Sequence, residues 1–87
     1  MFINKSSDNK NNICGEKISQ YRKELKLSQR ALADKLQLIG LNVDKNAIQR
    51  MESGQRFITD IELVYLAKAL DKRISDFFEE LTDRKEQ

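Results

Sequence analysis

Residues 28–54 read SQRALADKLQLIGLNVDKNAIQRMESG, and this stretch decides the fold. Ser28 and Asp44 are residue types that cap the first turn of a helix, and apolar residues follow each of them at helical intervals of three and four. The glycine that closes the stretch is a residue type that commonly ends a helix. Residues 37–43 between the two patterns contain one glycine and one asparagine, which both tolerate turn conformations. The stretch therefore predicts two short helices, the second over 45–52, joined by a connection.

Helical spacing continues on both sides of this stretch. Upstream, beginning at Cys14, a stripe expected to face the core is formed by Ile18, Tyr21, Arg22 and Leu25. Downstream, Thr59 and Glu62 have the spacing of a capping box that opens a fourth helix, and a short fifth helix is predicted over 74–81. The chain contains no proline, so no residue of that type interrupts these helices. We therefore predict a compact all-α fold of five short helices.

Composition divides the chain into three parts. Residues 1–12 are polar without periodicity and are predicted to form a flexible arm, residues 13–81 to form the domain, and residues 82–87 to form a charged tail. The formal net charge of +2 is unevenly spread. Residues 15–56 contain nine basic and five acidic residues, whereas residues 57–87 contain five basic and eight acidic ones. This asymmetry favours one face that meets a polyanion.

The residue inventory excludes several classes of protein. The chain has no histidine, so catalysis by a nucleophile that histidine activates is impossible, and Cys14 is the only cysteine. A lone cysteine can form neither an intrachain disulfide nor a zinc site. We expect no enzymatic activity, no cofactor or metal and no small-molecule ligand. Because the sequence shows no membrane-spanning run and no secretory signal, we expect a cytoplasmic protein with no membrane partner.

The predicted helix over 45–52 has two unlike faces at about 100° per residue. One is apolar except for Glu52. The other, here called the polar arc, consists of Lys45, Asn46, Gln49 and Arg50. Arginine can form paired hydrogen bonds with guanine in the major groove, and asparagine and glutamine can do so with adenine, so these four are candidate base contacts. The alternative is an ordinary solvated helix face. Candidate phosphate contacts around this helix are Ser28, Gln29, Ser53, Gln55 and Arg56.

Two charged residues lie on stripes that should face the core. Arg22 lies on the inward stripe of the first helix, and Glu52 lies beside Ile48 on the inward face of the third. A charge in a core needs a partner. We therefore predict a partly buried salt bridge between Arg22 and Glu52. The alternative is that both lie at stripe edges and reach water.

Three segments in this order resemble the phage-repressor/Cro-type helix-turn-helix family, also called the xenobiotic-response-element family. They are YRKELKLSQRALADKL at 21–36, IQRMESGQR at 48–56 and LAKAL at 66–70. The resemblance extends over about residues 15–80 and implies a lambda-repressor-like domain of five helices that binds double-stranded DNA. By position it assigns the polar arc to bases, Gln29 and Arg56 to phosphates, and a family salt bridge to Arg22 and Glu52.

Two departures from the family pattern concern the links between helices. The connection at 37–43 is about five residues longer than is usual in the family, which bears on the angle of the following helix. Asp71 stands where the family has a glycine after the fourth helix. The second departure predicts a helical or differently capped link to the fifth helix.

The resulting hypothesis is a sequence-specific transcriptional regulator, specifically a repressor, that binds a palindromic operator as a homodimer. Candidate dimer contacts lie near the C-terminal end: Phe77, Phe78 and Leu81. The alternative for the two phenylalanines is that both fill the core. The alternative function is a protein-interaction module, such as the antitoxin of a toxin–antitoxin pair or a co-regulator.

Overall fold

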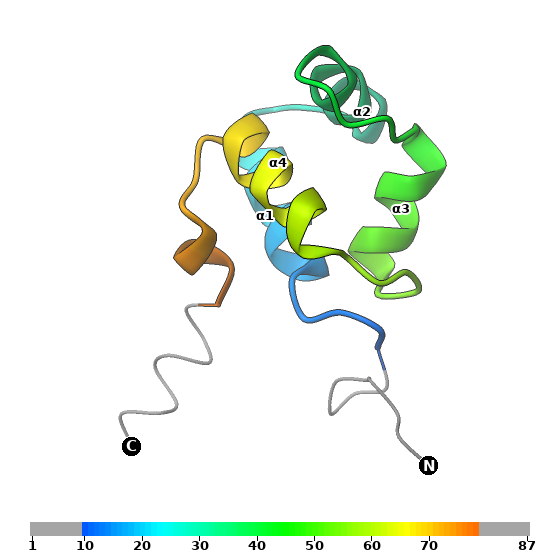
Figure 1. Cartoon of the computed structure of the whole chain (residues 1–87), viewed down its shortest axis with the longest axis vertical. Coiled ribbons are helices and arrows are strands. Elements are labelled where there is room, and N and C mark those ends of the chain that lie inside the picture. Colours follow the sequence, from blue (N-terminus) through cyan, green and yellow to red (C-terminus); the bar gives the residue numbers. More distant parts are fainter. Residues whose placement is uncertain (1–9, 79–87) are drawn as a thin grey trace.

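A computed structural model of the chain describes residues 10–78, and these residues are helical and without β-strands (Figure 1). The elements are α1 (Gly15–Glu24), α2 (Gln29–Leu38), α3 (Lys45–Ser53), α4 (Asp60–Leu70) and the 3₁₀ helix η1 (Ile74–Phe78). The predicted all-α class is confirmed. The predicted count of five α-helices is wrong for the described residues, because a 3₁₀ turn replaces the fifth helix over 74–78 and positions 79–81 lie outside them. None of the helices among residues 10–78 has the length and apolar character needed to span a bilayer.

Three helices begin at the caps that the sequence predicts. The Ser28 hydroxyl accepts a hydrogen bond from the amide three residues on at 3.0 Å, and the Asp44 carboxylate does the same at 2.8 Å. Thr59 and Glu62 form both hydrogen bonds of a capping box, at 3.1 and 3.0 Å. These contacts satisfy first-turn N–H groups that have no acceptor within the helix, so they fix where each helix starts.

Two helices end at residues in the left-handed region. Gly54, with φ of 83°, follows α3, as predicted. Asp71, with φ of 57°, follows α4 and occupies the backbone conformation that the family glycine would take. Aspartate tolerates this region better than most residues with a side chain. The departure from the family pattern therefore leaves the end of α4 capped in the usual left-handed way.

The connection between α2 and α3 is shorter than predicted, because α2 continues through Leu38. The remaining link is attached to the helix before it. The Gln37 side-chain amide donates to the carbonyl of Val43 at 2.7 Å, and Val43 itself is buried. Gly40, with φ of 110°, makes the turn. The link into α3 is thus held by a hydrogen bond and by core packing.

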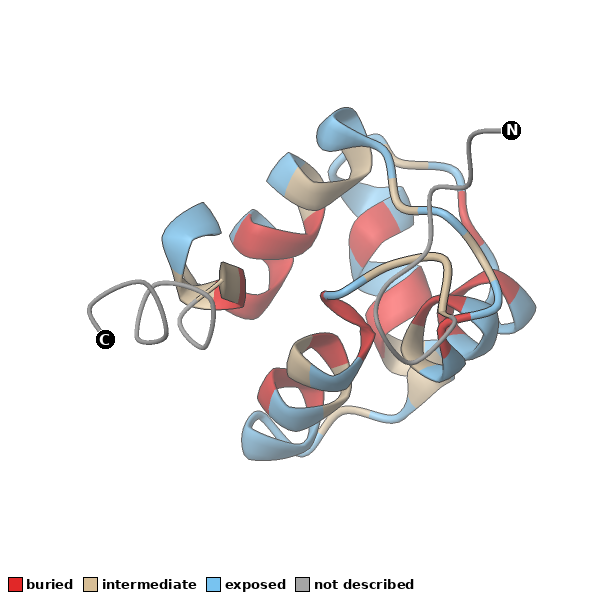
Figure 2. Cartoon of the chain, turned by 90° about the horizontal axis from the view of Figure 1, so that it is seen from below, coloured by how far each residue is buried: buried red, intermediate tan, exposed pale blue. Residues whose placement is uncertain are grey.

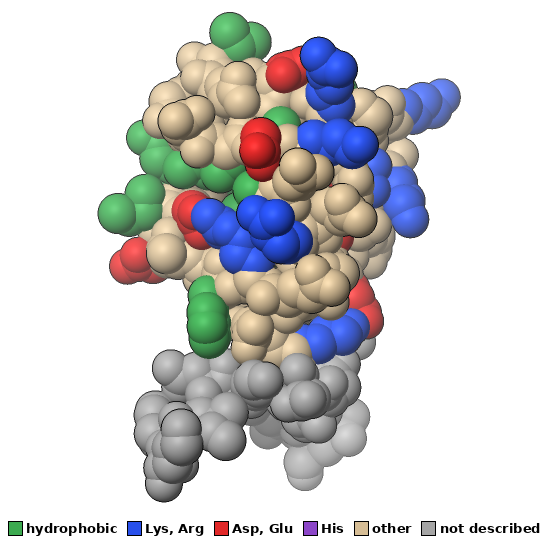
Figure 3. All heavy atoms as spheres, turned by 90° about the vertical axis from the view of Figure 1, so that its right-hand side faces the viewer, with side chains coloured by type: hydrophobic (Ala, Val, Ile, Leu, Met, Phe, Trp, Pro, Cys, Tyr) green, Lys and Arg blue, Asp and Glu red, His purple; other side chains and the backbone are tan. Residues whose placement is uncertain are grey.

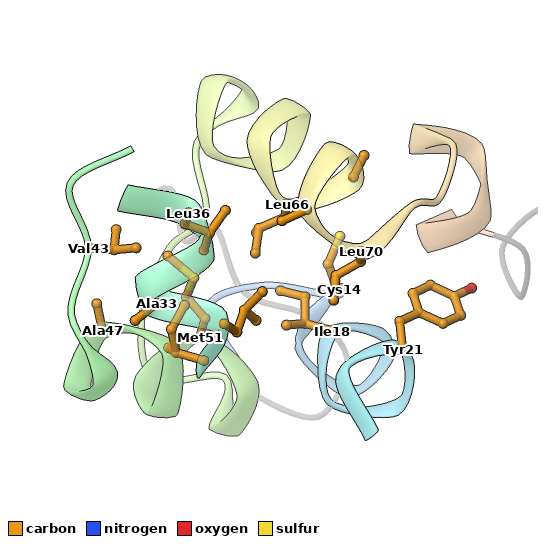
Figure 4. Close-up of a cluster of buried hydrophobic side chains, with 14 of the residues drawn as sticks. Cys14, Ile18, Tyr21, Ala33, Leu36, Val43, Ala47, Met51, Leu66 and Leu70 are labelled. Carbon is orange, nitrogen blue, oxygen red and sulfur yellow. The ribbon is translucent and has the colours of Figure 1, made fainter. Parts of the chain in front are cut away.

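The core is formed by side chains from all four α-helices (Figures 2 and 4). Its largest fully buried side chains are Ile18, Leu32, Leu36, Ile48, Met51, Leu66 and Leu70. The prediction that Leu25 faces inward is wrong: α1 ends at Glu24, and Leu25 is 43% exposed beyond that end. Cys14 is buried, and burial raises the pKa of its thiol to about 11. A thiol in this state is a poor nucleophile at neutral pH.

The described residues before α1 lie against the rest of the domain. The backbone amide of Asn11 donates to the carbonyl of Gly54 at 2.8 Å. Asn11 and Asn12, which the sequence places in the predicted arm, are hydrogen-bonded to the end of α3 and the residues just after it. The predicted arm at 1–9 and the predicted tail at 82–87 lie outside the described residues.

Candidate nucleic-acid interface

The two faces of α3 differ as the sequence pattern indicates. Its apolar residues Ala47, Ile48 and Met51 are buried against the core. The polar arc faces outward, and all four members are exposed: Lys45, Asn46, Gln49 and Arg50. The N-terminal cap at Asp44 and the left-handed Gly54 set the length of the helix that presents this arc.

Within residues 10–78, none of the four polar-arc side chains has a hydrogen-bond or ion-pair partner. Two are cations and two are amides, so the arc contains hydrogen-bond donors in every position and no carboxylate. Figure 3 looks onto the side of the molecule where α3 lies and shows Lys and Arg side chains gathered across it. The arrangement provides donors and positive charge, which suit base edges and phosphates.

A buried ion pair holds α3 to α1 and α2. Arg22 Nε lies 2.6 Å from Glu52 Oε2, and Arg22 Nη2 donates to Glu52 Oε1 at 3.0 Å. Gln29 Nε2 donates to the same Oε1 at 3.0 Å, and Arg22 Nη1 donates to the carbonyl of Leu27 at 2.8 Å. The predicted Arg22–Glu52 pair is therefore present. The sequence pattern did not identify Gln29 as a third partner, because its side chain lies at the edge of α2 rather than on a core stripe.

The candidate phosphate contacts differ in their exposure and in their hydrogen bonds. Ser28, Ser53 and Gln55 are exposed. The Gln29 side-chain amide donates one hydrogen bond to Glu52, and its backbone N–H is at the first position of α2, where the helix supplies no acceptor. The Ser53 hydroxyl donates to the carbonyl of Arg50 at 3.2 Å and retains its acceptor lone pairs.

Arg56 forms a bidentate pair that the sequence reasoning missed. Its Nη1 donates to Glu62 Oε1 at 2.9 Å and its Nη2 to Glu62 Oε2 at 2.8 Å. These bonds lower the pKa of Glu62 and raise that of Arg56, with burial opposing both shifts. A phosphate that approaches Arg56 must compete with this carboxylate. The available signal was the capping box itself, since it fixes Glu62 at the first turn of α4, close to the end of α3.

The lowered pKa of Glu62 predicts that its contribution to the free energy of unfolding depends on pH. A carboxylate with a lowered folded pKa stabilises the fold above its unfolded pKa, and this contribution is lost as the pH falls through the folded value. Glu62→Gln should lower the free energy of unfolding by about 1 kcal/mol near neutral pH. The difference from wild type should shrink toward about pH 3. Urea unfolding of wild type and Glu62→Gln, near neutral pH and at about pH 3, measures this difference in the free energy of unfolding. Arg56→Gln should reduce this pH dependence without abolishing it, because Thr59 also lowers the pKa of Glu62. An undiminished difference between wild type and Glu62→Gln at low pH would contradict the assignment.

The candidate dimer contacts at the C-terminal end do not form one exposed surface in the part of the chain that the structure describes. Phe77 is 2% exposed, and its ring lies edge-on against Tyr21 with centroids 5.3 Å apart, so its assignment as a surface contact is wrong. Phe78 is half-buried, and Leu81 lies outside the described residues. Exposed large apolar side chains are spread over the described residues, and the most exposed of them, Leu38, ends α2. Three others lie on the α3–α4 connection and on α4. We call these the apolar patch: Phe57, Ile61 and Val64.

Comparisons with known proteins agree with this geometry. A family model described as helix-turn-helix matches residues 18–77, which include α2, α3 and the link between them. Among solved structures, the restriction-modification controller protein C.AhdI from Aeromonas hydrophila is similar, with 28% sequence identity and a TM-score of 0.65. The match covers 74% of this chain and 89% of that one. No curated protein matches the sequence. The chain therefore belongs to the Cro/C1-type helix-turn-helix family of DNA-binding transcriptional regulators.

Proposed function

We propose that this chain is a sequence-specific regulator, acting as a repressor, that reads the major groove of duplex DNA with α3. The observation that supports this most strongly is the polar arc, in which four exposed donor-bearing side chains have no partner among residues 10–78. The helix of nine residues is about 13 Å long, which is comparable with the width of the major groove at about 12 Å. Bound in this way, the chain would repress by occupying DNA that a polymerase needs.

The proposal divides the contacts between bases and backbone. Bases meet the polar arc. Phosphates meet Ser28, the backbone amide of Gln29, Ser53, Gln55 and, in competition with Glu62, Arg56. The similarity to a restriction-modification controller protein supports a regulatory rather than an enzymatic role. The alternative of an interaction module, such as an antitoxin or co-regulator, would rest on the exposed apolar side chains, and it leaves the polar arc without a role.

We also propose that two copies of the chain pair through the apolar patch and together bind a palindromic operator. Phe57, Ile61 and Val64 are 55%, 64% and 39% exposed. Apolar side chains lie beside the basic surface along one margin of Figure 3. In such a pair, both α3 helices would have to lie on one side. Reading a palindrome requires this arrangement, with half-sites about 34 Å apart.

Selection of bound duplexes from random DNA tests the function. We expect an inverted repeat whose half-sites are about 10 base pairs apart. The affinity for it should fall steeply with added salt, because several phosphates are neutralised. Ile61→Glu should abolish pairing in solution and leave weak binding to a half-site. A wild-type chain that enriches no sequence, and binds DNA without salt dependence, would overturn the proposal in favour of an interaction module.

A further inference from the structure

Asn12, in the segment before α1, forms three hydrogen bonds through its side chain near the C-terminal end of α3. The Asn12 side-chain amide donates to the carbonyl of Met51 at 3.0 Å and to the carbonyl of Arg56 at 2.7 Å. Its oxygen accepts a hydrogen bond from the backbone amide of Gly15 at 2.8 Å. We call the two bonds to Met51 and Arg56 the Asn12 bridge. Both amide protons and the amide oxygen of this side chain are thus in use.

The backbones on either side of the bridge approach closely. A Cβ added at Gly15 would collide with the carbonyl oxygen of Met51, and one added at Gly54 would lie 2.7 Å from the side chain of Lys10. Asn11 adds a hydrogen bond from its backbone amide to Gly54, within the same contact. The start of α1 and the end of α3 therefore meet where two glycines leave room, and Asn12 joins them with hydrogen bonds.

We propose that Asn12 is a positioning residue that fixes the angle at which α3 presents the polar arc to DNA. The last carbonyls of a helix have no N–H donor within the helix. The Met51 carbonyl accepts from the amide of Gly54 at 3.2 Å, and Asn12 supplies it with a second donor and joins it to the carbonyl of Arg56 just beyond α3. The Arg22–Glu52 pair holds α3 through a side chain, whereas the Asn12 bridge holds its backbone. The inference rests on the proposed function, because it assumes that α3 is the helix that binds DNA.

Two substitutions separate the parts of this contact. Asn12→Ala removes the bridge and the bond to Gly15. Asn12→Asp keeps an acceptor for Gly15 but turns a carboxylate oxygen toward the carbonyls of Met51 and Arg56. We expect each to weaken binding by about tenfold, at a temperature where the variants are fully folded. The probe is a duplex with the site that wild type selects from random DNA. The preference for this site over a single-base variant should fall as well.

The matched control is Tyr21→Phe. It removes the hydrogen bond from the Tyr21 hydroxyl to the carbonyl of Asp76 at 2.7 Å, and thus loosens the attachment of η1 to α1. We expect this variant to lose stability but to bind DNA as wild type does. A second readout needs no DNA: the amide chemical shifts of residues 45–53 should change in both Asn12 variants and stay unchanged in Tyr21→Phe.

Each outcome separates this inference from the proposed function. If the Asn12 variants bind like wild type while Arg50→Ala weakens binding, the positioning role is wrong and the reading role of α3 stands. If Tyr21→Phe weakens binding as much as Asn12→Ala does, the effect is one of stability and the inference is also wrong. If wild type selects no site, the proposed function fails, and unchanged shifts over residues 45–53 would then refute the bridge independently.

Discussion

Glu52→Gln should lower the free energy of unfolding by about 3 kcal/mol, the largest effect on stability that we expect. The side chains of Arg22 and Glu52 are only 10% and 8% exposed, and Glu52 accepts three hydrogen bonds, two from Arg22 and one from Gln29. The substitution leaves the guanidinium buried beside a neutral amide, without a compensating charge. For a domain of this size the Tm should fall by more than about 10 °C, measured by thermal unfolding.

Two further variants test whether the buried charge causes this loss. Glu16→Gln makes the same chemical change in an ion pair at the surface, where the Glu16 side chain is 78% exposed and lies 3.3 Å from Lys10. It should cost less than about 0.5 kcal/mol. Replacing Arg22 and Glu52 together by methionine should recover part of the loss, since no unpaired charge remains. Equal effects of Glu52→Gln and Glu16→Gln would show that burial of the pair does not matter.

Arg50→Ala should weaken binding to the selected DNA site by about ten- to a hundredfold, the largest effect on function that we expect. The Arg50 side chain is exposed and has no partner among residues 10–78, so its removal should leave the Tm unchanged. An arginine that contacts a guanine discriminates among bases, and its loss should relax preference at one position of the site. Fluorescence anisotropy with the selected duplex and single-base variants measures both effects.

Arg73→Ala is the matched control for Arg50→Ala. It removes the same charge from a side chain that is 85% exposed, in the link between α4 and η1, where it forms a long ion pair of 3.7 Å with Asp76. Its effect on binding should be small and alike for all sequences, as expected for a charge outside the interface. If Arg50→Ala and Arg73→Ala weaken binding equally, α3 does not read the site through Arg50. Arg56→Ala is a poorer comparison, because it also breaks the pair with Glu62.

The features that could be read from the sequence are those set by near neighbours in the chain. The caps at Ser28, Asp44 and Thr59 each join atoms three residues apart, so residue type and spacing suffice to predict them. The division of α3 into a buried and a polar face follows from the helical repeat in the same way. The Arg22–Glu52 pair was predictable over 30 residues only because each charge lies on a core stripe and therefore needs a partner.

The tertiary structure alone decided contacts that no local pattern specifies. Periodicity placed Leu25 inward, but the helix ends one residue before it, and Phe77 is buried because Tyr21 lies opposite. Arg56 pairs with Glu62 because the α3–α4 connection folds back between them. Asn12 meets Met51, 39 residues away, and the pattern around it shows only a polar run. The sequence thus determined the helices, their faces and one ion pair, since these depend on spacing along the chain. Where α3 is held, and by which side chains, depends on how distant segments pack against one another.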